Sequence, residues 1–418
     1  MPTGYIESAM RFLLFLTFLT PLMAKPLALE TEAKAAVIMN ADTGAVLYAK
    51  NPHTLSYPAS TTKIGTFLYL LKAKGIDLNR EVAADADSLG WITSEEKKKA
   101  NYKKPAYWLE KGGTHYGIKN GEILTVRDLI RGLMIVSGND AANVLACYAG
   151  GTIPTFCVGM NQYLKGIGCK HTSYNNPHGL HHPDHVTTAY DLALMGREGL
   201  KYSFFREVVS TAQFTRPKTN KQESTPLICN NLLIVKGKKA YDPRVLGIKT
   251  GYTAAAGYTI VSAAQKGGRT VVIVLLGLEK RKALFAETTR LLDRVFKEQP
   301  VKQKFLKAGK QHATLDIPGA VQSISTQLEE DVELTFYPSE LPDLHTSILW
   351  NPPPLPIQAG SVIGDIQLVD EEGEVYASQP LLASATVEKT LWLRLQEMPL
   401  WIPSVVALVS VIFLTRFF

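Results

Sequence analysis

The order of three short polar strings along the chain constrains its fold more than any other feature. Ser60-Thr61-Thr62-Lys63 comes first, Ser137-Gly138-Asn139 second and Lys249-Thr250-Gly251 third. Each string occurs often by chance, whereas all three in this order predict one acyl-transfer site with a serine nucleophile. The chain must therefore fold so that three segments far apart in the sequence line one cleft.

The first string begins a segment of helical character, Ser60–Lys74, which stops at Gly75. Lys63 stands three positions after Ser60, so it shares the helix face and can reach the serine hydroxyl. A serine is a poor nucleophile until a base takes its proton, and a lysine is such a base only when burial or neighbouring cations lower its pKa. We expect the apolar stretch Ile64–Leu71 to supply that burial.

The second string follows a predicted helix, Val126–Val136, and precedes another, Asp140–Ala149. Ser137 and Asn139 are therefore expected at a tight corner between two helices. Short side chains at such a corner can point back into a cleft.

The third string ends a predicted strand, Val245–Thr250, after which we expect an antiparallel hairpin of Gly257–Gln265 and Thr270–Leu278. A strand that carries Lys249 and Thr250 to the edge of a cleft suits capture of a carboxylate. The cation and the hydroxyl match the charge and the lone pairs of that group.

These motifs resemble those of the low-molecular-mass penicillin-binding proteins that act as serine-type D-alanyl-D-alanine carboxypeptidases. The resemblance covers Lys34 to Gln299 and includes Asn176-Pro177-His178-Gly179-Leu180, followed by Ala189, Asp191 and Leu192. It implies a peptidoglycan stem peptide ending in D-Ala-D-Ala as the substrate, β-lactams as inhibitors, and no cofactor or metal.

The resemblance also implies a role for each string. The first supplies the acylated serine and its lysine base, the second completes the proton relay and holds the substrate amide, and the third binds the terminal carboxylate. Backbone amides of Ser60 and Tyr252 form an oxyanion hole, which stabilises charge that develops in the transition state. The implied residues are catalytic Ser60, Lys63, Ser137 and Asn139, and substrate-binding Lys249, Thr250, Gly251 and Tyr252.

Four segments are expected along the chain: a signal peptide (residues 1–24), a penicillin-binding serine peptidase domain (25–300), a small β-rich domain (301–390) and a C-terminal membrane anchor (391–418). The predicted class is α/β (α+β), with an antiparallel sheet flanked by helices and an inserted helical subdomain, as in β-lactamases and transpeptidases. A hairpin of Ala35–Met39 and Ala45–Tyr48 opens the sheet. The apolar stripe of Arg281–Glu298 predicts a helix that packs on it.

Both ends of the chain carry apolar segments. Phe12–Ala24 follows Met10-Arg11 and is typical of a secretory signal, and we expect translation to start at Met10 because no Lys or Arg precedes it. Met398–Phe418 carries one charge and would span roughly 31 Å as a helix, so it either crosses a bilayer or lies in its interface. We therefore expect an exported protein, periplasmic or on the outer face of the bacterial cytoplasmic membrane and anchored at its C-terminus.

Nucleic-acid binding and zinc-dependent peptidase activity agree less well with the sequence. A net charge of +7 could indicate nucleic-acid binding, but no motif for it is present, and an anionic envelope polymer or membrane explains the sign as well. A zinc peptidase would need the histidines between His178 and His185 to meet on one helix face. Pro177, Gly179 and Pro183 break any such helix, so we expect a surface loop beside the active site there.

Proteins that share this acylation chemistry are harder to distinguish from one another by sequence. A class A β-lactamase carries a glutamate after the second string that activates water, yet none occurs between Asn139 and Glu198. A β-lactam sensor would share the acylation residues and add a signalling domain. A transpeptidase or endopeptidase stays open because no motif encodes the acceptor.

The sequence leaves two further features open. The lysine-rich stretch Glu95–Lys111 is read as a solvated surface insertion in preference to a basic lip for acidic peptides. In an oxidising compartment, four cysteines allow three disulfide pairings. They are Cys147, Cys157, Cys169 and Cys229.

Overall fold

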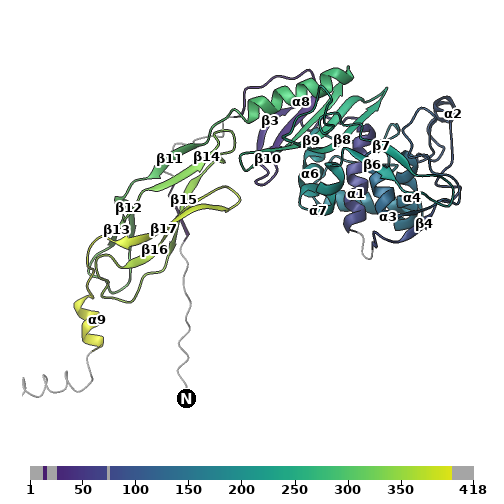
Figure 1. Ribbon diagram of the computed structural model, residues 1–418. Helices are drawn as coiled ribbons and strands as arrows, with labels where there is room; N and C mark the ends of the chain where they lie inside the picture. The colour runs from purple at the N-terminus through teal and green to yellow at the C-terminus, as the bar shows by residue number, and fades with distance from the viewer. Residues whose placement is uncertain (1–12, 17–25, 73–75, 398–418) are drawn as a thin grey trace, which may run out of the picture. The chain divides into compact units, whose positions relative to one another are not determined.

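The computed structural model describes residues 13–16, 26–72 and 76–397 (Figure 1). Contacts within the chain divide it after Gln299 into two compact units, one of which is Pro26–Gln299. The other comprises the described residues from Pro300 onward together with Leu13–Leu16. Each unit has its own sheet and its own hydrophobic core.

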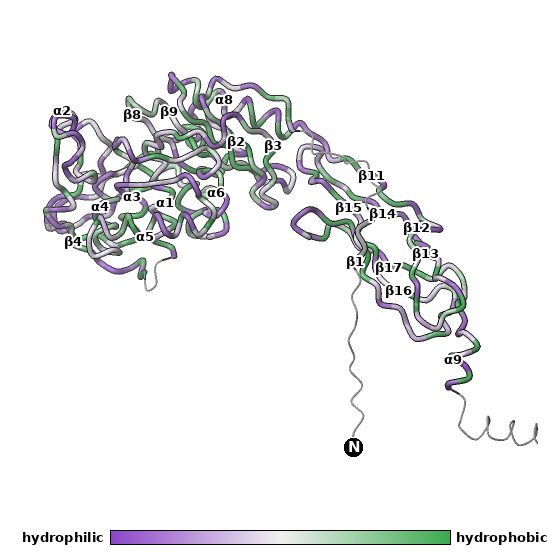
Figure 2. The backbone as a smooth tube through the Cα atoms, turned by 180° about the vertical axis from the view of Figure 1, so that it is seen from behind, coloured by the Kyte–Doolittle hydropathy of each residue, from purple (hydrophilic) through white to green (hydrophobic). Residues whose placement is uncertain are grey.

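The larger unit is built on a five-stranded antiparallel sheet with the order β3-β2-β10-β9-β8. Its strands are β2 (Ala35–Asn40), β3 (Val46–Lys50), β8 (Val245–Thr253), β9 (Gly257–Lys266) and β10 (Arg269–Leu278). The central strands are apolar runs, which suits burial on both faces; their hydropathy can be followed in Figure 2. Because β8 ends the sheet, the backbone groups of its outer side have no strand partner among the described residues.

Sequence-local signals account for the first hairpin of this sheet. The side chain of Asn40 accepts hydrogen bonds from the amides of Asp42 and Thr43, and Gly44 closes the turn with a φ of 84°. Glycine adopts that left-handed conformation without steric cost. The predicted hairpin at the start of the sheet is confirmed.

Helices cover both faces of the sheet (Figure 1). Helix α8 (Arg281–Val295) packs on β9 and β10, and α6 (Ala189–Leu200) lies against the opposite face, where Gly196 lets it approach Val261 and Val272. The remaining helical segments are η1 (Ala59–Thr61), α1 (Thr62–Lys72), α2 (Ser94–Lys99), α3 (Val126–Met134), α4 (Asn139–Gly150), α5 (Ile153–Gly166) and α7 (Ser203–Val209). Two small antiparallel two-stranded sheets pair β4 (Glu81–Ala83) with β5 (Ile123–Thr125) and β6 (Gln213–Arg216) with β7 (Thr225–Ile228). The expected antiparallel sheet with flanking helices is confirmed.

One helix boundary differs from the prediction in a way that matters for the site. Ser60 does not begin the α-helix; it lies in the 3-10 turn η1, and α1 starts at Thr62. The tight turn is held by Thr61 and Thr62, whose hydroxyls donate to the carbonyls of Pro58 and Ala59. Side chains that bond locally to the backbone compete with the regular helix at its start.

The smaller unit is β-rich. A six-stranded antiparallel sheet has the order β1-β15-β16-β17-β13-β12, and β11 pairs with β14. Its strands are β1 (Leu13–Leu16), β11 (Val301–Leu306), β12 (Gly309–Leu315), β13 (Ile324–Leu328), β14 (Val332–Phe336), β15 (His345–Trp350), β16 (Val362–Val369) and β17 (Val375–Ala383). The short helix α9 (Leu391–Gln396) follows.

The predicted signal peptide and membrane anchor fall mostly outside the described residues. Of the first, only Leu13–Leu16 is described, as strand β1 paired with β15; of the second, only the part up to residue 397 is. Within the described ranges, no single helix is long and apolar enough to cross a bilayer, although α4 and α5 pass that test together as a pair bent by 84°.

The four cysteines are all free thiols. Three of them are buried and Cys147 is half-buried, where its thiol donates to Asp85. None of the three possible pairings is formed, so the fold is held without a disulfide among these residues.

Candidate active site

The first string places Ser60 and Lys63 in direct contact. The Nζ atom of Lys63 lies 3.0 Å from Ser60 Oγ, because the 3-10 turn followed by the first turn of α1 puts residues three positions apart on one face. Lys63 is fully buried, as the apolar stretch that follows it predicted.

Two further oxygens surround the Lys63 amine. Nζ donates to Asn139 Oδ1 at 2.7 Å and to the carbonyl of His178 at 2.7 Å. Both atoms can only accept hydrogen bonds. A neutral amine has two N–H bonds and one lone pair, so it can satisfy both oxygens and still direct its lone pair at the Ser60 hydroxyl.

The electrostatics favour that neutral form. Burial holds the pKa of Lys63 well below its usual range, and the nearby cation Lys249 lowers it further, while Asp140 acts in the opposite direction. Desolvation penalises the charged form of an amine and a like charge does the same. Lys63 is therefore equipped to act as a base.

The second string lies opposite this pair at the corner predicted for it. Ser137 has a φ of 66°, and Asn139 is the first residue of α4. The hydroxyl of Ser137 is buried and has no hydrogen-bond partner among the residues that the structure describes. It is thus free to bond to a substrate atom.

The third string lies on the edge strand β8, next to the nucleophile. A Cβ at Gly251 would lie 2.8 Å from the backbone nitrogen of Ser60, so only glycine lets the strand come this close to the serine turn. Lys249 is buried, and burial lowers its pKa to about 8. Its Nζ donates to the carbonyl of Thr250 at 2.9 Å.

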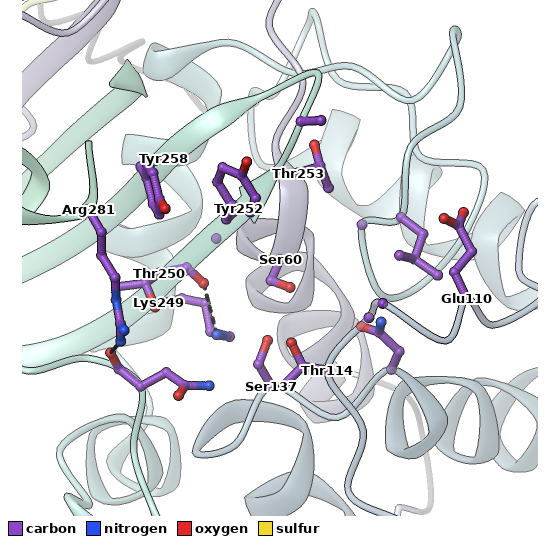
Figure 3. A pocket seen from close by; sticks show the side chains of 18 of the residues that line it. Ser60, Glu110, Thr114, Ser137, Lys249, Thr250, Tyr252, Thr253, Tyr258 and Arg281 are labelled. Carbon is purple, nitrogen blue, oxygen red and sulfur yellow. Dashed lines mark hydrogen bonds between the residues drawn. The ribbon is translucent and has the colours of Figure 1, made fainter. Parts of the chain in front are cut away.

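One cleft of about 510 Å³ joins the three strings (Figure 3). Ser60 lies near its centre with Ser137 and Thr114 next to it, Lys249, Thr250 and Arg281 lie on one side, and Glu110 lies on the other. Every predicted site residue except Lys63 lines the cleft, and Lys63 lies directly beneath Ser60. The structure therefore brings all eight predicted residues together.

Sequence reasoning missed several cleft residues. Arg281 begins α8 and adds a second cation on the side of Lys249, while Tyr258 on β9 packs against Tyr252 with ring centroids 4.4 Å apart. On the other side, Ser94 and Glu110 come from the lysine-rich region. No local pattern marks these residues, because only the folded chain brings them to the cleft.

The histidine-rich segment lies beside the cleft as predicted, but only part of it is at the surface, where Pro183 and Asp184 are exposed. His178 and His185 are buried, and burial holds the pKa of His178 well below its usual range and lowers that of His185 to about 3. The ring of His178 bonds to the carbonyl of Tyr107 and to the amide of Leu180. These bonds fix the position of His178, whose carbonyl accepts a hydrogen bond from the Lys63 amine. In the described part of the chain, no group of His, Cys, Asp or Glu is arranged to hold a metal ion.

Most of the lysine-rich stretch is solvated, as the sequence predicted, because all of its lysines except Lys97 are exposed. Lys97 is buried and pairs with Glu110 at 3.0 Å, and Glu110 also accepts from Ser94 at 2.6 Å. A charge is buried only when a partner compensates for its lost hydration. The buried pair therefore holds Glu110 where it lines the cleft.

Comparison with known proteins agrees with this geometry. The D-alanyl-D-alanine carboxypeptidase family (Peptidase_S11) matches residues 22–280. D-alanyl-D-alanine carboxypeptidase DacF of Bacillus subtilis is 32% identical over 372 residues, which cover 86% of this chain and 87% of that protein.

Solved penicillin-binding proteins and DD-peptidases have the same fold. Penicillin-binding protein 5 from Haemophilus influenzae is 26% identical with a TM-score of 0.59, over 87% of this chain and 100% of that one. A Streptomyces DD-transpeptidase is 27% identical with a TM-score of 0.55, over 64% of this chain and 98% of that one. This chain therefore belongs to the D-alanyl-D-alanine carboxypeptidase family and is a low-molecular-mass penicillin-binding protein, a serine-type DD-carboxypeptidase that acts on peptidoglycan.

Proposed function

We propose that Ser60 attacks the carbonyl carbon between the last two D-alanines of a stem peptide. Lys63, as a neutral amine, takes the hydroxyl proton while the new C–O bond forms. The C–N bond then breaks, free D-alanine leaves as its amine gains a proton, and the peptide stays on Ser60 as an ester. Water hydrolyses this ester and regenerates the serine.

The observation that carries this proposal is the environment of the Lys63 amine. Its two acceptor-only neighbours, Asn139 Oδ1 and the carbonyl of His178, use both N–H bonds of a neutral amine. The lone pair is then directed at Ser60 Oγ, 3.0 Å away. This is the geometry that a general base needs.

The proposed carboxylate site lies on the opposite side of the cleft from Glu110. Lys249 and Arg281 supply positive charge there, and Thr250 supplies a hydroxyl. A terminal carboxylate suits this group because charge-assisted hydrogen bonds to it are the strong ones. Only a free C-terminus would use both cations, which supports cleavage of the last residue.

The remaining roles follow from the same cleft. Backbone amides of Ser60 and Tyr252 are proposed as the oxyanion hole, worth about 3 kcal/mol per donor. The hydroxyl of Ser137, which has no hydrogen-bond partner in the described part of the chain, is proposed to pass a proton to the leaving amine. The side-chain amide of Asn139 is proposed to hold the substrate peptide.

We expect the purified protein to release D-alanine over many turnovers from a peptide ending in D-Ala-D-Ala, and to stay acylated by penicillin far longer than one peptide turnover. Free D-alanine departs and leaves room for water, whereas the leaving amine of a β-lactam stays tethered to the acyl group. The amount of released D-alanine measures peptide turnover, and the lifetime of a labelled penicillin adduct measures how long the protein stays acylated.

Two outcomes of that experiment would change the assignment. Rapid catalytic hydrolysis of penicillin without D-alanine release would make the protein a β-lactamase. Slow D-alanine release that an added amine accelerates, with the amine found in the product, would favour a transpeptidase.

We further propose the four-part organisation predicted above, with export through residues 1–24 and anchoring through 391–418. Helix α9 supports the anchor, because Leu391, Trp392 and Leu395 are exposed to solvent. Apolar and aromatic residues in this position suit the membrane interface. The cleft would then act outside the cytoplasmic membrane.

Deleting Leu391–Phe418 is expected to move the protein from the membrane to the soluble fraction without reducing kcat on a small peptide. The deletion removes apolar surface and no cleft residue. Ultracentrifugation and a D-alanine assay measure the two effects, with the full-length chain as the control. Complete membrane retention of the shortened chain would show that the anchor lies elsewhere.

A further inference from the structure

Asp140 is a buried carboxylate that holds the segment directly after Gly113 and Thr114, two residues that line the cleft. It follows the second string directly and is 2% exposed. Neither composition nor the motif pattern gives it a role, since the string ends at Asn139. We propose that Asp140 is a positioning residue, which fixes the 113–118 segment and, through it, the side chain of Asn139 for attack by Ser60. This inference rests on the proposed function.

The carboxylate of Asp140 is saturated with backbone donors. Oδ1 accepts from the amides of Tyr116 at 2.7 Å and Ala141 at 2.9 Å. Oδ2 accepts from Gly117 at 2.7 Å and Ile118 at 3.0 Å. Three consecutive amides of one segment therefore point at a single carboxylate, and no side chain competes for it in the described structure.

Only an ionised aspartate can do this. Each of its oxygens accepts from two N–H groups, whereas an asparagine offers one oxygen and one NH2 group. The NH2 group would face two N–H donors and repel them. The segment would then move away from α4 on one side.

The held segment in turn touches Asn139. The amide of Asn139 donates to the carbonyl of Thr114 at 2.9 Å. A Cβ at Gly113 would lie 2.6 Å from Asn139 Nδ2, so the side-chain amide rests directly on this glycine. The same side chain places Oδ1 on the Lys63 amine. A shift of the segment therefore changes the position of the group that orients the base.

The test compares Asp140→Asn and Asp140→Glu with Asp191→Ala. Asp191 is the matched control: it is 1% exposed, lies in the first turn of α6, and accepts from His171 and Thr172 in a segment that does not line the cleft. Asp140→Glu keeps the charge but moves it by one methylene, so it tests position if Asp140→Asn fails to fold.

The readout is the rate per active site. The fraction of active protein is counted by complete labelling with fluorescent penicillin, well below each melting temperature. Acylation rate and kcat for D-alanine release are then divided by that fraction. A residue that only supports folding changes the active fraction and not these rates.

Both Asp140 variants are expected to lose about 10- to 100-fold in acylation rate per labelled site, because small misplacements of catalytic groups cost rates of this order. Asp191→Ala should stay within about twofold of the unmodified protein while losing thermal stability. Rates per site equal to those of the unmodified protein in a folded Asp140 variant would overturn the inference. An unmodified protein that acylates but releases no D-alanine would instead overturn the proposed function, while the acylation rates still test Asp140.

Discussion

Ser60→Ala is expected to abolish covalent labelling by penicillin and to lower D-alanine release by about a million-fold, below detection. No other hydroxyl in the described chain contacts the Lys63 amine, so no second nucleophile can replace it. The fold should survive, since Lys63 keeps its bonds to Asn139 and His178. Mass spectrometry of penicillin-treated protein and a D-alanine assay provide the measurement.

The control for this change is Ser210→Ala. Ser210 is exposed at the end of α7, and its hydroxyl donates to the backbone of its own helix at Glu207. Labelling and turnover should be unchanged in this variant. A penicillin adduct on Ser60→Ala would show that another residue is the nucleophile.

Lys63→Met is expected to lower the acylation rate by about 10³-fold, in the range that general-base catalysis contributes. Methionine has a similar length but no base, so the Ser60 proton has no nearby acceptor. The oxygens of Asn139 and His178 also lose their donor, which should lower the melting temperature. The rate of labelling by fluorescent penicillin, per folded protein, measures the effect, and Lys72→Met at the exposed end of α1 is the control.

The acylation rate is expected to depend on pH through the protonation of Lys63. Lys63 must be neutral to accept the proton, and burial together with the cation of Lys249 disfavours its charged form against the opposing carboxylate of Asp140. In the unmodified protein, the acylation rate should therefore rise with pH along a limb whose midpoint lies well below the roughly 10.4 of an ordinary lysine. Lys63→Met should lack that limb. A limb unchanged in the variant would show that Lys63 is not the base.

Much of this site could be predicted from the sequence. The order of the strings indicated one cleft, and the apolar residues after Lys63 indicated its burial. Hairpins and helices followed from patterns within a few residues of one another, because alternation and helical spacing are local properties. The start of α1 was placed two residues early, since the hydroxyls of Thr61 and Thr62 hold a 3-10 turn there.

What only the tertiary structure decided is the choice of partners between distant segments. The Lys63 amine donates to Asn139 and to the carbonyl of His178, which come from two other parts of the chain. These two acceptors leave the lone pair of a neutral amine directed at Ser60. In the same way, the charged neighbours of Lys97 in the sequence suggested that it is exposed. The folded chain instead brings Glu110 within reach and buries Lys97 beside it. A residue type and its neighbours in sequence determine what it can bond to. Only the folded chain determines which donors and acceptors come within reach, because that depends on packing over long separations.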